Sequence, residues 1–458
     1  MIENDAFKLL LINLFHLNPD DITNIVCTTF NKMMVLLVTL ADKHQACPYC
    51  GFTAPKIKEY VTKEITHSAL TTQKCIIKYR ARRYKCPCCG KTYYEFNPFV
   101  FKSQKISILT VHNILKDLKD FNETFTSVAR RYHVSPTSVS TIFDNHVDIG
   151  RNPLPEIINF DEVYAFKSEK SKYVCVLLDF KKQIPVDVLP NRKKEFLLNY
   201  FQKIPLEERK KVKYACSDMY EVYRDVVHKV FPCSCMLLDY FHLSQDFHKK
   251  MNEVRIKVMK GYKDNKASDE YYLLKKFNWL LFKNPEDEDK YGRLFDVERE
   301  RKYNSHFKSY MNYYDLRRKL LEINNDLTIC YSLKLELVDF YSKSTIDNAQ
   351  VNLEHLIRSC IDTNIEEMIA FSNNLINWKQ EIINSFTIVG AEYKVEADKG
   401  QVVVCNKKVN NAIIENRNKI IKCIKNNANG YTNWLRFRNR VMYVLDPNAT
   451  FSLEPKEK

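Results

Sequence analysis

The chain has 458 residues, of which 71 are Lys or Arg and 56 are Asp or Glu, so the formal net charge is +15. An apolar content of 45% excludes wholesale disorder, and the absence of any run of about 18 uncharged apolar residues argues against a transmembrane helix. The length allows about two to four domains, and the basic excess indicates a polyanionic partner, with nucleic acid the first candidate.

Residues 1–40 are predicted to form short helices, because Asp5–Phe15 is amphipathic and Pro19 opens a second element. The acidic start of the chain does not resemble a secretory signal. Most of the 15 cysteines are therefore expected to be free thiols or metal ligands in a reducing compartment, the cytoplasm.

Residues 41–100 contain two matched turns, Cys47-Pro-Tyr-Cys50-Gly51 and Cys86-Pro-Cys-Cys89-Gly90. Each CxxC turn can point two thiolates at one ion, so the pair predicts a zinc ribbon with one structural Zn²⁺. The ligands are then Cys47, Cys50, Cys86 and Cys89, with Cys88 an alternative to Cys86 or Cys89. A redox motif would need a single CxxC at a helix start.

The chain leading into and through the second turn is strongly basic. Residues 74–91 hold seven basic residues and no acid, with strand-like alternation over Cys75–Tyr84. A solvated face is the alternative, but phosphate contact by Arg82 and Arg83 is favoured in a chain of this charge.

Residues 101–150 are predicted to form a helix-turn-helix DNA-binding domain, with its signature over Ser127–Ile142. Ala129 is small where the helices touch, His133 stands at the turn, and Ser135 caps the second helix. An ordinary helical hairpin is the alternative. The residues placed to reach DNA are Ser135, Thr137, Ser138 and Thr141.

A Pro-rich break at Asn152–Pro155 precedes a change to strands. Three short strands, a helix, a strand, a helix and a strand follow, which is the order of an RNase H-like α/β domain. This domain is assigned to residues 151–250 and 395–445, and a mostly helical insertion to residues 251–394. The fold class is multidomain α+β.

Three aspartates mark the strands of this domain. Asp161 lies inside a largely apolar strand, where a carboxylate is costly unless it is hydrogen-bonded or bound to metal. Asp218 and Asp239 end the fourth and fifth strands. In the RNase H-like layout the fourth strand lies beside the first, so Asp161 and Asp218 are expected to converge, and Asp239 is expected to lie further out.

The third carboxylate is predicted on a later helix. Residues 399–445 hold ten basic residues and one acid, Glu415, a ratio that favours a phosphate-binding face with one metal ligand. Lys419 and Lys422 follow one and two turns along the same face as Glu415, and a simple Glu415–Lys419 pair is the alternative. Two Asp and one Glu are ligands suited to Mg²⁺ or Mn²⁺.

These residues resemble the ISL-three family of bacterial DDE transposases. The likeness covers the cysteine turns, the segment 127–142 and three catalytic blocks. The blocks are Phe160-Asp161-Glu162, then Ser217-Asp218-Met219-Tyr220 with Asp239-Tyr-Phe-His242, and Ile413-Ile-Glu415-Asn416 with Asn433 and Arg438.

The resemblance implies that Asp161, Asp218 and Glu415 are the DDE triad of an insertion-sequence transposase. It implies that the N-terminal modules bind terminal inverted repeats, and that the core hydrolyses a phosphodiester and transfers the strand to target DNA with Mg²⁺ or Mn²⁺, as a DNA-bound homo-oligomer. The rival interpretations are a non-catalytic, domesticated DNA-binding regulator, which has no need of the three carboxylates, and a structure-specific nuclease.

Overall fold

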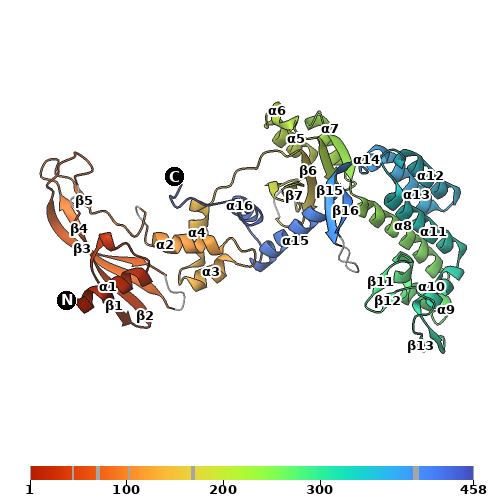
Figure 1. Ribbon diagram of the computed structural model, residues 1–458, viewed down its shortest axis with the longest axis horizontal. Coiled ribbons are helices and arrows are strands. Elements are labelled where there is room, and N and C mark those ends of the chain that lie inside the picture. Colours follow the sequence, from red (N-terminus) through yellow and green to blue (C-terminus); the bar gives the residue numbers. More distant parts are fainter. Residues whose placement is uncertain are drawn as a thin grey trace.

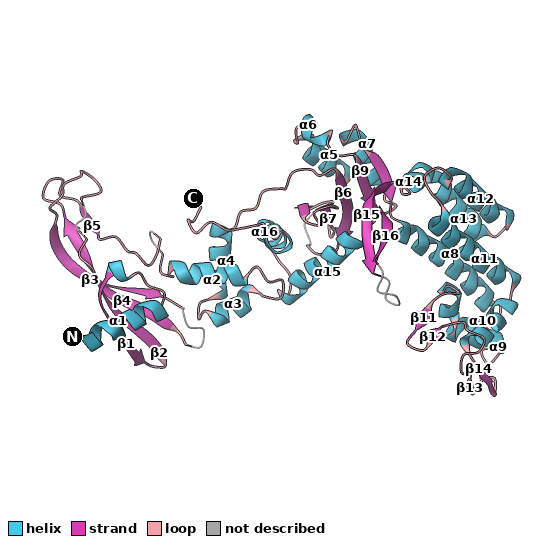
Figure 2. Ribbon diagram, in the orientation of Figure 1, coloured by secondary structure: helices cyan, strands magenta, loops and turns pink. Residues whose placement is uncertain are grey.

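The computed structural model describes residues 2–43, 46–68, 73–101, 104–166, 171–395 and 402–456. The molecule is elongated, with an N-terminal sheet at one end and a helical domain at the other (Figure 1). A small helical unit and a central sheet lie between them (Figure 2). The chain is therefore a multidomain α+β protein. No helix among the described residues is both long and apolar enough to cross a membrane.

The N-terminal sheet has the order β1-β2-β4-β3, with β5 paired to β4. Its elements are α1 (Ile2–Leu14), the 3-10 turn η1 (Pro19–Asp21), β1 (Ile22–Phe30), β2 (Met33–Leu40), β3 (Lys56–Thr66), β4 (Cys75–Lys85) and β5 (Thr92–Tyr94). The prediction of short helices is wrong for residues 22–40, which form a hairpin. Asn31 and Lys32 take φ of 49° and 60° there, which suits a tight hairpin turn, and the β-branched residues of β1 favour a strand.

Three short helices follow: α2 (Ile108–Asp117), α3 (Phe125–Arg131) and α4 (Pro136–His146). The Ser135 hydroxyl accepts a hydrogen bond from the Ser138 amide at 3.0 Å and so caps α4. His133 takes the left-handed conformation, φ 54°, in the turn between α3 and α4. The two helices therefore have the turn that their sequence predicts.

The central sheet has the order β10-β9-β6-β7-β8. Its strands are β6 (Ile157–Val163), β7 (Val174–Asp179), β8 (Pro185–Leu189), β9 (Tyr214–Ser217) and β10 (Cys235–Leu238). The strands β6, β7 and β8 are antiparallel, whereas β9 runs parallel to β6 and β10 parallel to β9. This is the RNase H-like arrangement, as predicted.

Helices cover both faces of this sheet. The helices α5 (Lys194–Gln202) and α7 (Glu221–Val230) share a core with Phe160 on one face, and α6 (Leu206–Arg209) lies between them in the chain. On the other face α15 (Ala412–Asn427) and α16 (Trp434–Leu445) pack against Val163 and Val176. Alternate residues of β6 therefore face different helix pairs.

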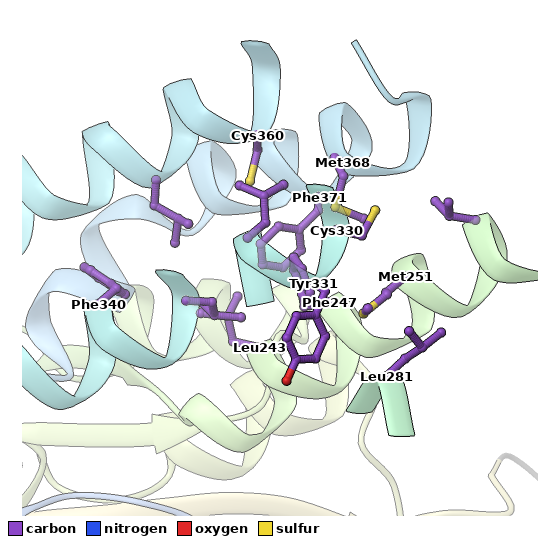
Figure 3. Packing of buried hydrophobic residues seen from close by; sticks show 14 of the residues in the cluster. Leu243, Phe247, Met251, Leu281, Cys330, Tyr331, Phe340, Cys360, Met368 and Phe371 are labelled. Atoms are coloured by element: carbon purple, nitrogen blue, oxygen red, sulfur yellow. The ribbon is translucent and has the colours of Figure 1, made fainter. Parts of the chain in front are cut away.

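The helical domain is inserted after β10. Its helices are α8 (Tyr240–Lys260), α9 (Asp269–Lys276), η2 (Asn278–Phe282), α10 (Tyr313–Glu322), α11 (Asn325–Lys343), α12 (Ala349–Asp362), α13 (Glu366–Asn377) and α14 (Lys379–Asn384). Figure 3 shows their apolar core, in which Phe247 packs against Phe371.

Short hairpins interrupt the helices of this domain. They are β11 (Glu288–Asp289) with β12 (Gly292–Arg293) and β13 (Lys302–Asn304) with β14 (Ser309–Met311). A longer hairpin, β15 (Ile388–Val395) with β16 (Val402–Lys408), returns the chain to the central sheet.

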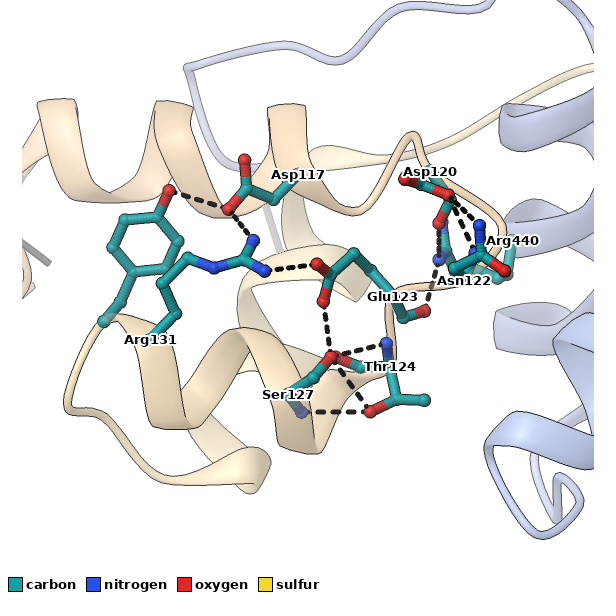
Figure 4. Close-up of polar contacts among 9 residues, drawn as sticks. Asp117, Asp120, Asn122, Glu123, Thr124, Ser127, Arg131 and Arg440 are labelled. Atoms are coloured by element: carbon teal, nitrogen blue, oxygen red, sulfur yellow. Dashed lines mark hydrogen bonds and ion pairs between the residues drawn. The ribbon is translucent and has the colours of Figure 1, made fainter.

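The three-helix unit is bound to the domain of the central sheet through α16. Arg440, only 1% exposed, donates to the carbonyls of Asp120 and Glu123 at 2.8 Å each. Figure 4 shows these contacts beside Arg131, which bridges Asp117 and Glu123. The α3–α4 pair therefore has a defined orientation relative to the central sheet.

Candidate active site

Three aspartates lie side by side at one edge of the central sheet. Asn159 of β6 pairs with Cys216 of β9, so Asp161 and Asp218, each two residues further on, lie level with one another. Ser217 pairs with Leu238 of β10, and Asp239 follows directly. Parallel strands thus bring their carboxyl ends, and these carboxylates, together.

Asp161 is buried and held by two hydrogen bonds. Its Oδ2 accepts from Asn418 Nδ2 of α15 at 2.7 Å, and its Oδ1 accepts from the Glu162 amide at 2.7 Å. Burial raises the pKa of Asp161 to about 7, and the nearby carboxylates of Asp218 and Glu415 add to the rise. The sheet thus holds a carboxyl group where its charged form is disfavoured.

Asp218 is also in an unfavourable setting for a lone charge. Burial raises the pKa of Asp218, and the nearby side chains of His242 and Arg192 offset part of this rise. Within the described part of the chain, its buried Oδ1 has no hydrogen-bond partner. A buried carboxylate oxygen of this kind is stabilised by a cation.

Glu415 reaches the same edge from the first turn of α15. Asn411, which precedes this helix, accepts from Asn159 Nδ2 at 2.7 Å and donates from its own side chain to the Phe160 carbonyl at 3.3 Å. Its amide donates to Asp239 Oδ1 at 3.3 Å. These bonds fix the start of α15 against β6 and β10.

Asp239 lies one strand further from Asp161 than Asp218 does, as predicted from the strand order, but it also lies near Glu415. Asp239, His242 and Glu415 have ligand atoms within 4.8 Å of one another. The first turn of α15 contacts the end of β10, where the Asn411 backbone amide donates to Asp239 Oδ1. The residue that sequence reasoning missed is His242, although the Asp239-Tyr-Phe-His242 spacing places both side chains on one side of the first turn of α8.

The four predicted zinc ligands form a second cluster, in the N-terminal sheet. The sulfurs of Cys47 and Cys89 are 3.7 Å apart and those of Cys50 and Cys86 are 3.5 Å apart. Sulfurs of a tetrahedral Zn²⁺ site lie about 3.8 Å apart, from a Zn–S bond of about 2.3 Å. All four are mutually close, and Cys88 is exposed outside the cluster. The donor set therefore fits one zinc ion.

The predicted DNA-contacting residues differ in how far they are exposed to solvent. Arg82 is 15% exposed, because it pairs with Glu95 at 2.7 Å and donates to the Leu40 carbonyl at 3.1 Å. Arg83 is half-buried and pairs with Glu59 at 2.7 Å. Arg82 is thus held within the sheet rather than on a free surface.

The polar residues on the helices are more accessible. Ser135, Thr137 and Thr141 are exposed around α4, and Ser138 is half-buried. Lys419 and Lys422 are exposed on α15, whose first turn carries Glu415.

Residues 158–391, just over half of the chain, match the family model of the ISL-three DDE transposases, which is described as a transposase. The chain belongs to this family. It is also similar to a protein named "Transposase for insertion sequence element IS1001" from Bordetella parapertussis. The two are 19% identical over 409 residues, which cover 89% of this chain and 90% of that one. As a member of this family, the chain is a transposase, an enzyme whose partner is DNA.

Proposed function

We propose that this transposase cuts DNA at the ends of its own insertion sequence, with Asp161, Asp218 and Glu415 as the catalytic carboxylates. The observation that carries the proposal is their convergence from β6, β9 and α15 on one edge of an RNase H-like sheet. A regulator that only binds DNA has no use for a buried Asp161 whose pKa is raised further by the nearby carboxylates of Asp218 and Glu415. The fold and the family support the same reading.

The donor set fits Mg²⁺ or Mn²⁺. Carboxylate oxygens are hard ligands suited to these ions, and the unpartnered Oδ1 of Asp218 is a ligand atom that the described residues leave unsatisfied. Such ions, when bound, activate a water or a 3′-hydroxyl and stabilise the leaving oxygen of the scissile phosphate.

The surrounding residues orient these ligands. Asn418 fixes one oxygen of Asp161, and Asn411 fixes the start of the helix that carries Glu415. Lys419 and Lys422 continue along the exposed side of α15, where we place the DNA backbone next to the cleavage site.

The N-terminal modules bind the terminal inverted repeats in this proposal. Thr137 and Thr141, exposed one turn apart on α4, contact base edges, with Ser135 and Ser138 at the helix start. Arg83 contacts phosphate, while Arg82 holds its strand in place. Zn²⁺ bound by Cys47, Cys50, Cys86 and Cys89 stabilises the ribbon.

The bound DNA end is positioned by the link between α4 and the catalytic domain. Arg440 and the Arg436–Asp144 pair, at 2.6 Å, join the three-helix unit to α16. Both element ends must be cut, so we propose a DNA-bound homo-oligomer acting in the bacterial cytoplasm. The freed 3′-hydroxyl then attacks target DNA.

A cleavage assay on a labelled duplex tests the proposal. The duplex carries an inverted repeat taken from the DNA that flanks the gene. With Mg²⁺ the wild-type chain should cut at the repeat end, and Asp218→Asn should bind the repeat without cutting it. Asp225→Asn, on α7 and paired with Lys194, is the matched control and should cut normally. Repeat binding without cleavage by the wild type would instead support a regulator.

A further inference from the structure

His242 lies between two carboxylates in a way that hydrogen bonding does not explain. Its Nε2 is 3.8 Å from Asp239 Oδ2 and 3.8 Å from Glu415 Oε1. Both distances exceed the limit of about 3.2 Å for a normal N–H···O bond. Within the described ranges, His242 Nε2 and Asp239 Oδ2 are buried without a hydrogen-bond partner, and Asp239 is only 4% exposed.

The same distances suit ligands of one cation. Two ligands bound at about 2.1 Å to one ion lie roughly 3.0 to 4.2 Å apart. The two distances from His242 fall in this range, and all three ligand atoms lie within 4.8 Å of one another. The remaining pair, Asp239 and Glu415, has ligand atoms within 4.8 Å of each other. Glu415 is half-buried at the start of α15, so rotation of its side chain can bring these two atoms to the separation expected of ligands of one ion.

The backbone prepares this arrangement. Asp239 Oδ1 accepts the Asn411 amide at 3.3 Å, which leaves Oδ2 as the oxygen that lies near His242. His242 stands three residues after Asp239 on the first turn of α8. The strand end, α8 and α15 therefore hold an Asp, a His and a Glu in one place.

We propose that Asp239, His242 and Glu415 form a binding site for a divalent transition cation, next to Asp161 and Asp218. The imidazole decides the class of ion, because a nitrogen ligand favours transition cations over Mg²⁺. The inference rests on the proposed function only in that Glu415 belongs to both sites. It adds two ligands, Asp239 and His242, to the cation centre.

The test uses the full-length, tag-free chain with Mn²⁺ as the probe and needs no DNA. Electron spin echo spectroscopy of bound Mn²⁺ detects the ¹⁴N of a coordinating imidazole, and a titration gives the affinity. Wild-type chain should show the nitrogen coupling. His242→Gln should lose the coupling and bind Mn²⁺ at this site about tenfold or more weakly, as removal of a fixed ligand or its support does.

Three further variants sharpen the result. His228→Gln, an exposed histidine on α7, should keep the coupling. Asp239→Asn should weaken binding while His242 is intact, which tests the site if His242→Gln does not fold. Asp161→Asn should keep the coupling even though it stops DNA cleavage. The nitrogen coupling therefore tests this inference, and the cleavage assay tests the proposed function independently of it.

Two outcomes overturn the inference. One is a wild-type chain whose bound Mn²⁺ shows no nitrogen coupling. The other is a coupling that persists in His242→Gln, because the nitrogen then comes from another residue. Either result leaves His242 as a structural contact between Asp239 and Glu415.

Discussion

The two clusters of ligand residues differ in how the chain builds them. The four cysteines come from two short turns, 47–50 and 86–89, in one small sheet, and Gly51 and Gly90 follow with φ of 75° and 70°. The carboxylate cluster joins residues from Asp161 to Glu415, carried by three strands and two helices. A local motif therefore defines the first cluster, whereas the second exists only when the central sheet and α15 are assembled.

The surroundings of the clusters differ as well. The cysteine cluster has a small core, in which Tyr84 and Tyr93 pack beside it. The carboxylates lie on a sheet with an apolar core on each face. We therefore expect metal to hold the ribbon together, and we expect the catalytic sheet to fold without its cation.

Loss of zinc should give the largest effect. Structural Zn²⁺ contributes about 10 kcal/mol or more to small domains of this kind. Cys47→Ser with Cys89→Ser should lower the zinc content from about one ion per chain to none, measured by metal analysis. Limited proteolysis should then cut within the ribbon while the central sheet stays protected.

The neighbouring cysteine provides the control for the zinc experiment. Cys88 is exposed and lies outside the cluster, so Cys88→Ser should retain zinc and protease resistance. Zinc loss in Cys88→Ser would show that the ligand set is wrong.

Loss of Glu415 should act on chemistry and leave folding intact. Glu415→Gln should reduce cleavage by at least about 10³-fold, since a metal ligand contributes several kcal/mol to transition-state stabilisation. Thermal unfolding should stay close to that of the wild type, because the side chain is half-buried at a helix start. Wild-type cleavage by this variant would show that the third carboxylate lies elsewhere.

Sequence reasoning succeeded where the signal was local. The cysteine turns, the capping Ser135 and the left-handed His133 each depend on a few neighbouring residues, and the structure has them as expected. The strand order of the central sheet was also predictable, because an α/β core with three hairpin-joined strands has few possible topologies.

The missed features depend on tertiary contacts. Residues 22–40 form a hairpin whose second strand, β2, also pairs with β4, a partner more than 30 residues away. His242 lies near Glu415 because the first turn of α15 contacts the end of β10. Arg82 has Glu95 as its partner through the pairing of β4 with β5. The β2–β4 pairing and the approach of α15 to β10 do not appear in the local pattern of residues, whereas the spacing of Asp239 and His242 does.

Removal of the Asp161 charge should stabilise the metal-free fold. Burial raises the pKa of this carboxyl to about 7, above its ordinary value of 3.8, so the folded state binds its proton more tightly than the unfolded state does. The favourable contribution of the Asp161 carboxyl to the stability of the fold is complete below pH 3.8 and is lost as the pH rises through 7. Denaturation in Mg²⁺-free buffer should therefore show Asp161→Asn about 1–3 kcal/mol more stable than wild type at pH 8.

The pH series and added cation check the cause of this difference. The difference in stability between Asp161→Asn and wild type should be smaller at pH 5, where the wild-type carboxyl is largely protonated. Mg²⁺ added at pH 8 should stabilise the wild type more than the variant. An equally large gap at both pH values would mean that the charge of Asp161 is not what destabilises the site.

The smallest effect should come from Glu162, the residue next to Asp161 on the opposite face of β6. Glu162 pairs with Arg192 and accepts a hydrogen bond from Tyr223 at 3.4 Å. Glu162→Gln should cost about 1 kcal/mol of stability, as loss of a partly buried ion pair does, and should change cleavage by no more than about twofold. Arg192 keeps its place in the variant, because its guanidinium lies over the rings of Tyr173 and Tyr220, at 4.6 and 4.8 Å. A tenfold loss of cleavage with unchanged stability would place Glu162 in the chemistry and extend the carboxylate cluster across both faces of the strand.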